Sequence, residues 1–207
     1  MRRFTDNNSV IRKDSNTSSI VNQPYYKEKE EVFSTPKITF LFRNDETFGV
    51  EVYQNGGTEK LKNDGGNEWT PMYLSMVKGS PIIGESAKSD YRNFPNYVVY
   101  DILKVIGKPV HVINHMDPKP KNNITVKDEE NCFVVKTPCA EDRHISEERI
   151  MAAFLKIQKE QVEKSLKTDI KSVFISTDFA LTDFQKAVFL KAASKLKLEI
   201  LSFALNY

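Results

Sequence analysis

The chain has 207 residues, of which 40% are hydrophobic and 28% charged, and its formal net charge is +2. This length suits one domain with a substantial core, and so small a net charge argues against a nucleic-acid-binding protein. No apolar run approaches the roughly 18 residues of a membrane-spanning helix, which argues against an integral membrane protein.

Residues 1–36 are rich in Ser, Asn, Thr, Lys and Glu, and their few apolar residues fit neither a helical nor a strand period. This composition predicts a disordered N-terminal tail. The basic residues of this segment make a mitochondrial presequence an alternative, but Asp6 and Asp14 argue against it, because presequences are poor in acidic residues. Nothing resembles a secretory signal, so we expect a cytoplasmic or nuclear protein. Cys132 and Cys139 lack zinc-type spacing, so we expect reduced thiols and no metal site.

After the tail, short apolar segments alternate with turn residues. The segment 54–57 predicts a hairpin turn, because its two glycines accept a positive φ, and 63–67 predicts a second turn. Four strands are predicted around these turns, at residues 38–42, 49–53, 58–62 and 71–77.

The middle of the chain predicts one helix and a small β-rich region. Apolar residues at near-helical spacing over 96–106 predict a helix that ends at Gly107. Clusters of Pro, Asn and Asp divide residues 109–138 into a predicted β-meander. Its strands are expected at 110–113, 124–126 and 132–135.

The last section predicts two helices and two strands. Ser146 is expected to cap a helix whose first turn holds Glu147 and Glu148, and Thr182 is expected to cap a second helix. Residues 173–175 and 198–205 are nearly continuous apolar segments, typical of strands covered on both faces. Since a helix lies between them, they are expected to be parallel, with a right-handed crossover.

Two parts of the sequence resemble one known family. The first part has three segments that follow, in order, three sequence patterns of that family. Asp64–Pro71 resembles N-D/E-x-G-N-R-x-T-P, Ile83–Lys88 resembles I/V-G-x-x-A-K, and Asn96–Gly107 resembles N-T-V-x-D-x-K-R-x-I-G. Residues 173–186 and 198–205 stand where that family has A-V-I-T-V-P-A-Y-F-N-D-x-Q-R and L-x-V-L-R-I-I-N-E-P. Both resemble the nucleotide-binding domain of the 70 kDa heat-shock chaperone family.

This resemblance covers residues 38–206 and implies an α/β fold. The expected architecture is the first lobe of an actin-like, ribonuclease H-like ATPase: a mixed sheet flanked by helices, with a small β-rich insertion at about 109–138. The lobe is expected to span residues 37–207, after the tail of residues 1–36. In the family, ATP lies between this lobe and a second one. The pattern of the second lobe is absent from this sequence, so we expect an incomplete cleft.

The positions that handle ATP in the family differ here. A carboxylate about 6 Å from a phosphate oxygen costs about 2–3 kcal/mol at an effective dielectric near 20, and leucine cannot stabilise a transferring phosphoryl group. We therefore expect no ATP cofactor, no catalytic residue and no ATPase activity. The altered positions are Phe42 for the family's aspartate, Asn44 for its glycine, Asp45 and Glu46 for its two threonines, Leu103 for its catalytic lysine, Asp178 for a proline and Asn206 for a glutamate.

Other family positions are retained, and we expect them to act in turns, packing and helix capping. They are Gly66, Asn67, Thr70, Pro71, Gly84, Lys88, Gly107 and Gln185.

Three functional hypotheses remain open. The favoured one is a non-catalytic adaptor or regulator, whose protein partner is a chaperone, a co-chaperone or a ribosome-associated factor, with no nucleic acid or membrane involved. The second is an ATP-binding chaperone fragment that completes its cleft with another polypeptide, against which Asp45, Glu46 and Leu103 argue. The third is a decayed, truncated paralogue without a maintained function.

Trp69, Phe203 and Leu205 are the candidate interface residues. Tryptophan is common among interface hot spots, although Trp69 packing against its own strand edge is equally compatible with the sequence. Phe203 and Leu205 are expected to share one face of a C-terminal strand that needs cover from outside this lobe.

Overall fold

The computed structural model describes residues 35–118, 123–127, 130–139 and 142–206. The predicted tail, residues 1–36, lies outside the described residues except for its last two positions. In the part of the chain that is described, no helix is both long and apolar enough to cross a membrane.

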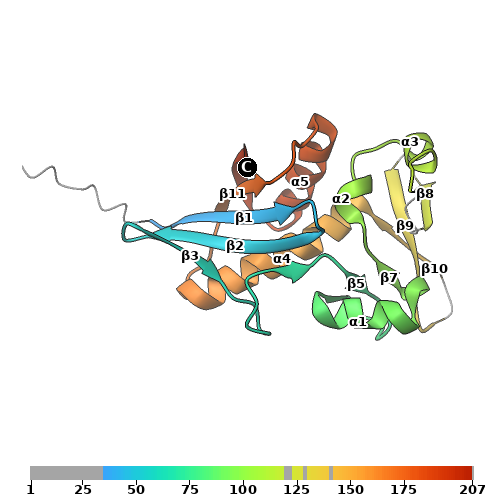
Figure 1. The fold of residues 1–207 in the computed structure, drawn as a ribbon, viewed down its shortest axis with the longest axis horizontal. Helices are drawn as coiled ribbons and strands as arrows, with labels where there is room; N and C mark the ends of the chain where they lie inside the picture. Colours follow the sequence, from blue (N-terminus) through green and yellow to red (C-terminus); the bar gives the residue numbers. More distant parts are fainter. Residues whose placement is uncertain (1–34, 119–122, 128–129, 140–141, 207) are drawn as a thin grey trace, which may run out of the picture. The chain divides into compact units, whose positions relative to one another are not determined.

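A mixed sheet of six strands holds the first and last parts of the chain together (Figure 1). The strand order is β12–β11–β1–β2–β3, with the short strand β4 also paired to β2. The strands β1 (Lys37–Arg43), β2 (Thr47–Gln54) and β3 (Gly57–Leu61) are antiparallel, whereas β11 (Ser172–Thr177) runs parallel to β1. The last strand, β12 (Glu199–Leu205), runs parallel to β11. The predicted first hairpins and the predicted parallel pair are confirmed.

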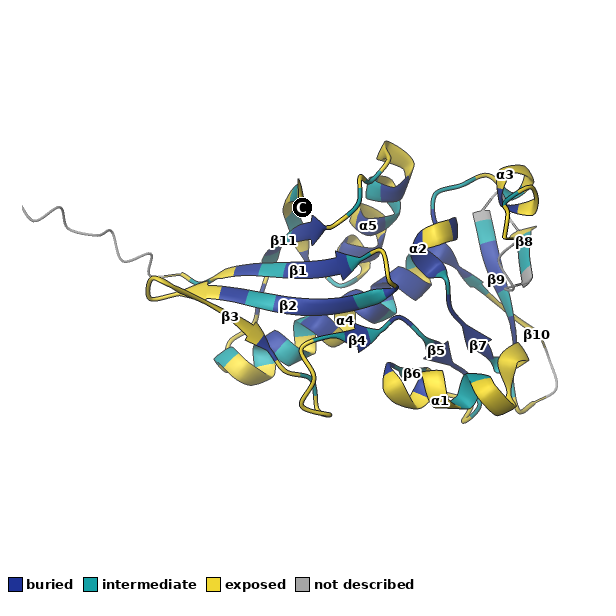
Figure 2. Cartoon of the chain, viewed as in Figure 1, coloured by how far each residue is buried: buried dark blue, intermediate teal, exposed yellow. Residues whose placement is uncertain are grey.

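One face of this sheet forms the core, because alternate residues of each strand point to the same side. The helices α4 (Glu147–Leu166) and α5 (Asp183–Lys195) cover that face. Phe154 of α4 meets Phe48 with ring centroids 5.6 Å apart, and Phe189 of α5 meets Phe42 at 5.0 Å. Figure 2 shows the resulting buried residues, in dark blue, along β1, β2 and α4.

The two helices begin differently. Thr182 forms a capping box at the start of α5, since its Oγ1 accepts the Gln185 main-chain N–H and the side-chain Oε1 of Gln185 accepts the Thr182 N–H. Ser146 stands at the predicted N-cap of α4, but its side chain makes no capping hydrogen bond. The predicted start of α4 is therefore confirmed, while the predicted role of the Ser146 hydroxyl is wrong.

The segment between β3 and α4 forms a second region with two small three-stranded sheets. One sheet has the order β6–β5–β7 and the other β10–β9–β8. Its strands are β4 (Thr70–Pro71), β5 (Leu74–Ser75), β6 (Ile82–Ile83), β7 (Val98–Val99), β8 (Asn123–Lys127), β9 (Glu130–Lys136) and β10 (Asp142–Ser146). Its helices are α1 (Glu85–Asn93), the 3₁₀ turn η1 (Pro95–Tyr97), α2 (Ile102–Val105) and α3 (Val110–Asn114).

Three predictions for this region are wrong. The strand expected at 71–77 is two short strands, β4 and β5. The helix expected at 96–106 is η1, β7 and α2, because Asp101 adopts a left-handed φ of 53° and interrupts any continuous helix. The strand expected at 110–113 is the helix α3, which Pro109 precedes at the N-cap, where its missing N–H has no cost. The meander is formed by β8, β9 and β10 instead.

The strand β12 is not covered on both faces as its apolar sequence predicts. It lies at the edge of the sheet, and Leu201 and Leu205 are 49% and 39% exposed. A register shift opposite Val173 and Phe174 inserts one extra residue into β12, so its apolar residues do not all follow one alternation. The overall α/β class, with a mixed sheet flanked by helices, is confirmed.

Candidate functional site

The β1–β2 turn carries three of the altered positions, Asn44, Asp45 and Glu46. The Asn44 N–H donates to Asp178 Oδ1 at 2.7 Å, at the end of β11. Arg43 forms ion pairs with Asp45 at 3.5 Å and with Asp178 at 3.8 Å, and the Thr47 hydroxyl donates to Asp45. The polar groups of this turn are therefore engaged with one another, and one arginine partly neutralises two carboxylates.

Phe42 and Leu103 are the altered positions that carry no polar group. Phe42 is 1% exposed at the end of β1, and its ring contacts Phe48 and Phe189. Leu103 is 5% exposed on α2. Both side chains belong to the hydrophobic core, so they provide neither a proton carrier nor a charge at these positions.

Glu46 joins the β1–β2 turn to α2. It has a left-handed φ of 60° and is 8% exposed. Its Oε2 accepts the Leu103 N–H at 3.3 Å, whereas its Oε1 has no hydrogen-bond partner among the described residues. Burial raises the pKa of this carboxyl to about 7, and the charge of Asp101 acts in the same direction, against the Leu103 N–H.

These contacts limit the chemistry of the region. Near Glu46, the Lys104 ammonium donates to Asp101 at 2.7 Å, and this hydrogen bond raises the pKa of Lys104. Within the described ranges, no cluster of three or more His, Cys, Asp or Glu side chains is suited to a metal ion. The pKa of Glu46, about 7, lies at neutral pH, but the carboxyl is buried.

The retained positions around the turn at 63–67 form a hydrogen-bond network. Asn63 Oδ1 accepts the N–H groups of Gly65 and Asn67. Asn63 Nδ2 donates to Thr70 Oγ1 and to Glu85 Oε1, which also accepts the Asn67 side-chain amide. The network fastens this turn to β4 and to the start of α1. The predicted structural role of Asn67 and Thr70 is confirmed.

Gly107 marks the junction of α2, α4 and α5. Its φ is +68°, and a Cβ there would lie 2.7 Å from the Gln185 N and 2.8 Å from the Phe184 carbonyl carbon. The Gly107 N–H donates to Glu147 Oε2 at 2.9 Å, and Gln185 Nε2 donates to the Leu103 carbonyl. Only glycine fits this close approach, so the predicted packing role of Gly107 is confirmed.

The three candidate interface residues differ in exposure: Trp69 and Phe203 are half-buried, and Leu205 is exposed. The half-buried Trp69 ring lies against Gly49, 4.8 Å from the Arg43 guanidinium and 5.1 Å from the Lys60 ammonium. Phe203 is half-buried and contacts Phe189, while Leu205 is exposed. Trp69 thus packs on its own sheet, and the interface role of all three residues stays a prediction.

Sequence reasoning missed the surroundings of Glu147. Its place in the first turn of α4 indicates an exposed side chain near the helix dipole, yet the residue is 8% exposed. Its carboxylate accepts the Gly107 N–H and the Asn131 side-chain amide at 2.8 Å. No local pattern gives this position, because its partners lie 40 and 16 residues away.

Comparison with known proteins gives one consistent family. The model of the Hsp70 protein family matches residues 46–202. Heat shock cognate 70 kDa protein 3 of Dictyostelium discoideum is 27% identical over 154 residues, covering 73% of this chain and 24% of its own length. Heat shock 70 kDa protein 14 of Xenopus tropicalis is 26% identical over 162 residues, covering 73% of this chain and 30% of its own length. A shorter match to heat shock 70 kDa protein cognate 1 of Drosophila simulans has 36% identity over 59 residues, 28% of each chain. The chain thus spans only 24–30% of the length of these relatives.

Proposed function

The chain belongs to the Hsp70 family, and we propose that it is a non-catalytic interaction module of that family, which acts as an adaptor or regulator of a chaperone or of another protein assembly. The observation that carries the proposal is the burial of Phe42 and Leu103. They stand where the family pattern has an aspartate and a catalytic lysine, and their side chains pack in the core.

The charges of the β1–β2 turn support the same conclusion. Asp45 and Glu46 replace two threonines of the family's phosphate-binding pattern. Arg43 pairs with Asp45, so Glu46 is the carboxylate that we count as uncompensated. Its pKa of about 7 leaves it about half ionised at neutral pH, and its ionised form costs about 2–3 kcal/mol near a phosphate. Since about 1.4 kcal/mol is a tenfold change, the ionised form lowers ATP affinity by about 100-fold.

The alternative of an ATP-binding chaperone fragment has one observation in its favour, which is the family fold itself. In that case ATP is the cofactor, and another polypeptide completes the cleft. The buried Leu103 and the Glu46 carboxylate beside it count against this alternative. A decayed paralogue is the third possibility, and it predicts no specific partner.

The partner in the favoured case is a protein, with a chaperone, a co-chaperone or a ribosome-associated factor as candidates, in the cytoplasm or nucleus. Affinity purification of the full chain, with mass spectrometry, tests this part. We expect one such factor to be recovered in stoichiometric amount. Recovery of no specific protein would instead support the decayed paralogue.

A further inference from the structure

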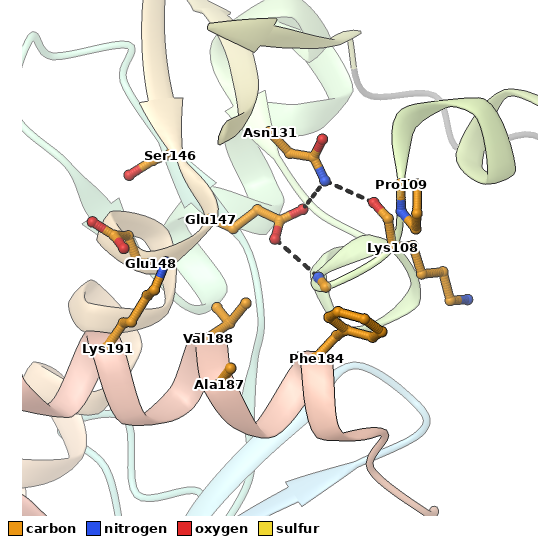
Figure 3. Close-up of a pocket in the computed structure, with 11 residues that line it drawn as sticks. Lys108, Pro109, Asn131, Ser146, Glu147, Glu148, Phe184, Ala187, Val188 and Lys191 are labelled. Carbon is orange, nitrogen blue, oxygen red and sulfur yellow. Dashed lines mark hydrogen bonds between the residues drawn. The ribbon is translucent and has the colours of Figure 1, made fainter. Parts of the chain in front are cut away.

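A cavity of about 350 Å³ opens between α5 and the segment that follows α2 (Figure 3). Phe184, Ala187 and Val188 give α5 an apolar wall, and Pro109 lies across from them. The Glu147 carboxylate lies at the centre of the view. The volume is at the small end of the range for ligand pockets, about 300–1,000 Å³. None of the altered ATP positions lines this cavity.

Hydrogen bonds fix the polar wall of the cavity. Asn131 Nδ2 donates to the Lys108 carbonyl at 2.7 Å and to Glu147 Oε1 at 2.8 Å. The second carboxylate oxygen of Glu147 accepts the Gly107 N–H. These bonds tie α4, β9 and the 107–109 segment together. Because these bonds hold the wall in place, binding requires little reorganisation.

Phe184 and Ser146 both line the cavity. Phe184 is 75% exposed, the most exposed of the large hydrophobic side chains described. Ser146 is 9% exposed, and its hydroxyl has no hydrogen-bond partner among the described residues. A large exposed aromatic beside a hollow is typical of a contact surface.

The charge around the cavity is positive. Glu148 is already paired with Lys195 at 2.7 Å. Lys108 and Lys191 line the cavity and form no ion pair within the described part of the chain. The lining holds two lysines and two glutamates, and Lys195, which lies outside the lining, pairs with Glu148. The two lysines of the lining therefore outnumber the one remaining carboxylate, that of Glu147, by one positive charge. Such a rim attracts carboxylates and repels a basic segment.

We propose that this cavity binds an acidic segment of a partner protein through one large aliphatic side chain. The aliphatic side chain packs against Phe184 and Val188, and the flanking carboxylates of the segment face Lys108 and Lys191. This proposal rests on the proposed adaptor function and names the surface and the partner chemistry for it.

Titration of the ¹⁵N-labelled full chain tests the proposal. The probe is a short acetylated and amidated peptide with a central leucine flanked by glutamates. We expect submillimolar binding, with amide shifts concentrated at Gly107, Phe184, Val188 and Lys191. Replacing the glutamates of the peptide by lysines, or its leucine by glycine, is expected to weaken binding at least tenfold.

Two surface variants locate the site. Ala187→Trp fills the cavity and Lys191→Glu reverses part of the rim charge, and each is expected to weaken peptide binding at least tenfold. Lys171→Glu is the matched control, because Lys171 lies before β11 and does not line the cavity. All three positions are exposed, so circular dichroism should report an unchanged fold.

Three results would overturn the proposal: no amide shifts at millimolar peptide, equal binding of the lysine peptide, or binding that both cavity variants leave unchanged. The proposed adaptor function fails separately. A chain that recovers a specific partner but does not bind the peptide uses another surface, whereas a chain that recovers no partner contradicts the adaptor function itself.

Discussion

Two turns of the main sheet can be compared directly. The turn at 63–67 keeps the family pattern, and Asn63 and Asn67 connect it to Thr70 and Glu85. The β1–β2 turn departs from the pattern, and its groups bind Asp178 and the Leu103 N–H instead. Both turns are internally bonded, so both hold structure. The difference is that only the second stands where the family pattern binds phosphate, and we propose that it has lost that function.

Restoring the family's aspartate at position 42 should have the largest effect. Phe42→Asp removes a ring that is 1% exposed and buries a carboxylate among Phe48 and Phe189. We expect a loss of at least about 4 kcal/mol in the free energy of unfolding. Urea denaturation measures it, with Phe174→Asp on the half-exposed side of β11 as the milder control. A stable Phe42→Asp variant would mean that this position is not part of the core.

Gly107→Ala tests the retained scaffold. The new Cβ would meet the α5 backbone at 2.7 Å, in a residue with a φ of +68°. We expect a loss of about 2–4 kcal/mol from strain and contact together. Gly56→Ala is the matched control, because Gly56 has a φ of +78° with nothing within 4 Å of its Cβ, and it should cost about 1 kcal/mol. Equal losses in the free energy of unfolding for the two variants would show that Gly107 has no packing role.

Glu46 makes the stability of the β1–β2 turn depend on pH. Its pKa is about 7 in the folded chain against a usual 4.5. Below pH 4.5 the carboxyl is protonated in both states and costs nothing. As pH rises from about 4.5 to 7, the unfolded chain ionises while the folded chain keeps its proton, so stability falls by about 3 kcal/mol in total and changes little above the folded pKa.

Glu46→Gln should therefore stabilise the chain by about 2–3 kcal/mol at pH 8.5 and leave it nearly unchanged at pH 4. Chemical denaturation at both pH values measures this. Glu51→Gln, on the half-buried side of β2, controls for the loss of one negative charge. A gain of the same size at both pH values would show that burial of the charge is not its cause.

Arg43→Ala should have the smallest effect. Its ion pairs to Asp45 and Asp178 are 3.5 Å and 3.8 Å long between partly exposed side chains, and such pairs contribute at most about 1 kcal/mol. The same change removes the guanidinium over the Trp69 ring. Since Trp69 is the one tryptophan, its emission should shift while stability changes little. A loss above about 2 kcal/mol would make this pairing a main support of the turn.

The parts of the fold that sequence predicts are those with strong local signals. The short apolar segments of β1 and β2, the glycine turn after β2 and the Thr182 cap each arise from neighbouring residues. The strand predicted at 110–113 is wrong because a four-residue segment with three apolar residues does not distinguish a strand from a helix. The exposure of Leu201 and Leu205 agrees with the expectation that β12 needs cover from outside this lobe. Its place at the edge of the sheet does not follow from sequence, because an apolar strand at an edge has the same sequence as one in the middle.

The candidate site divides in the same way. The altered positions were found by aligning motifs, which needs no structure. The burial of Glu46, the partners of Glu147 and the cavity beside Phe184 depend on contacts between segments far apart in the chain. Long-range packing, rather than any local pattern, decides which carboxylate is buried and which hollow stays open.

Calorimetric titration of the full chain with Mg-ATP tests the central claim most directly. An Hsp70 with the unaltered pattern, titrated in parallel, serves as the positive control. If Phe42, Glu46 and Leu103 have removed nucleotide binding, the chain should give no binding heat at micromolar ATP. A clear micromolar isotherm would contradict the account and favour the ATP-binding chaperone fragment.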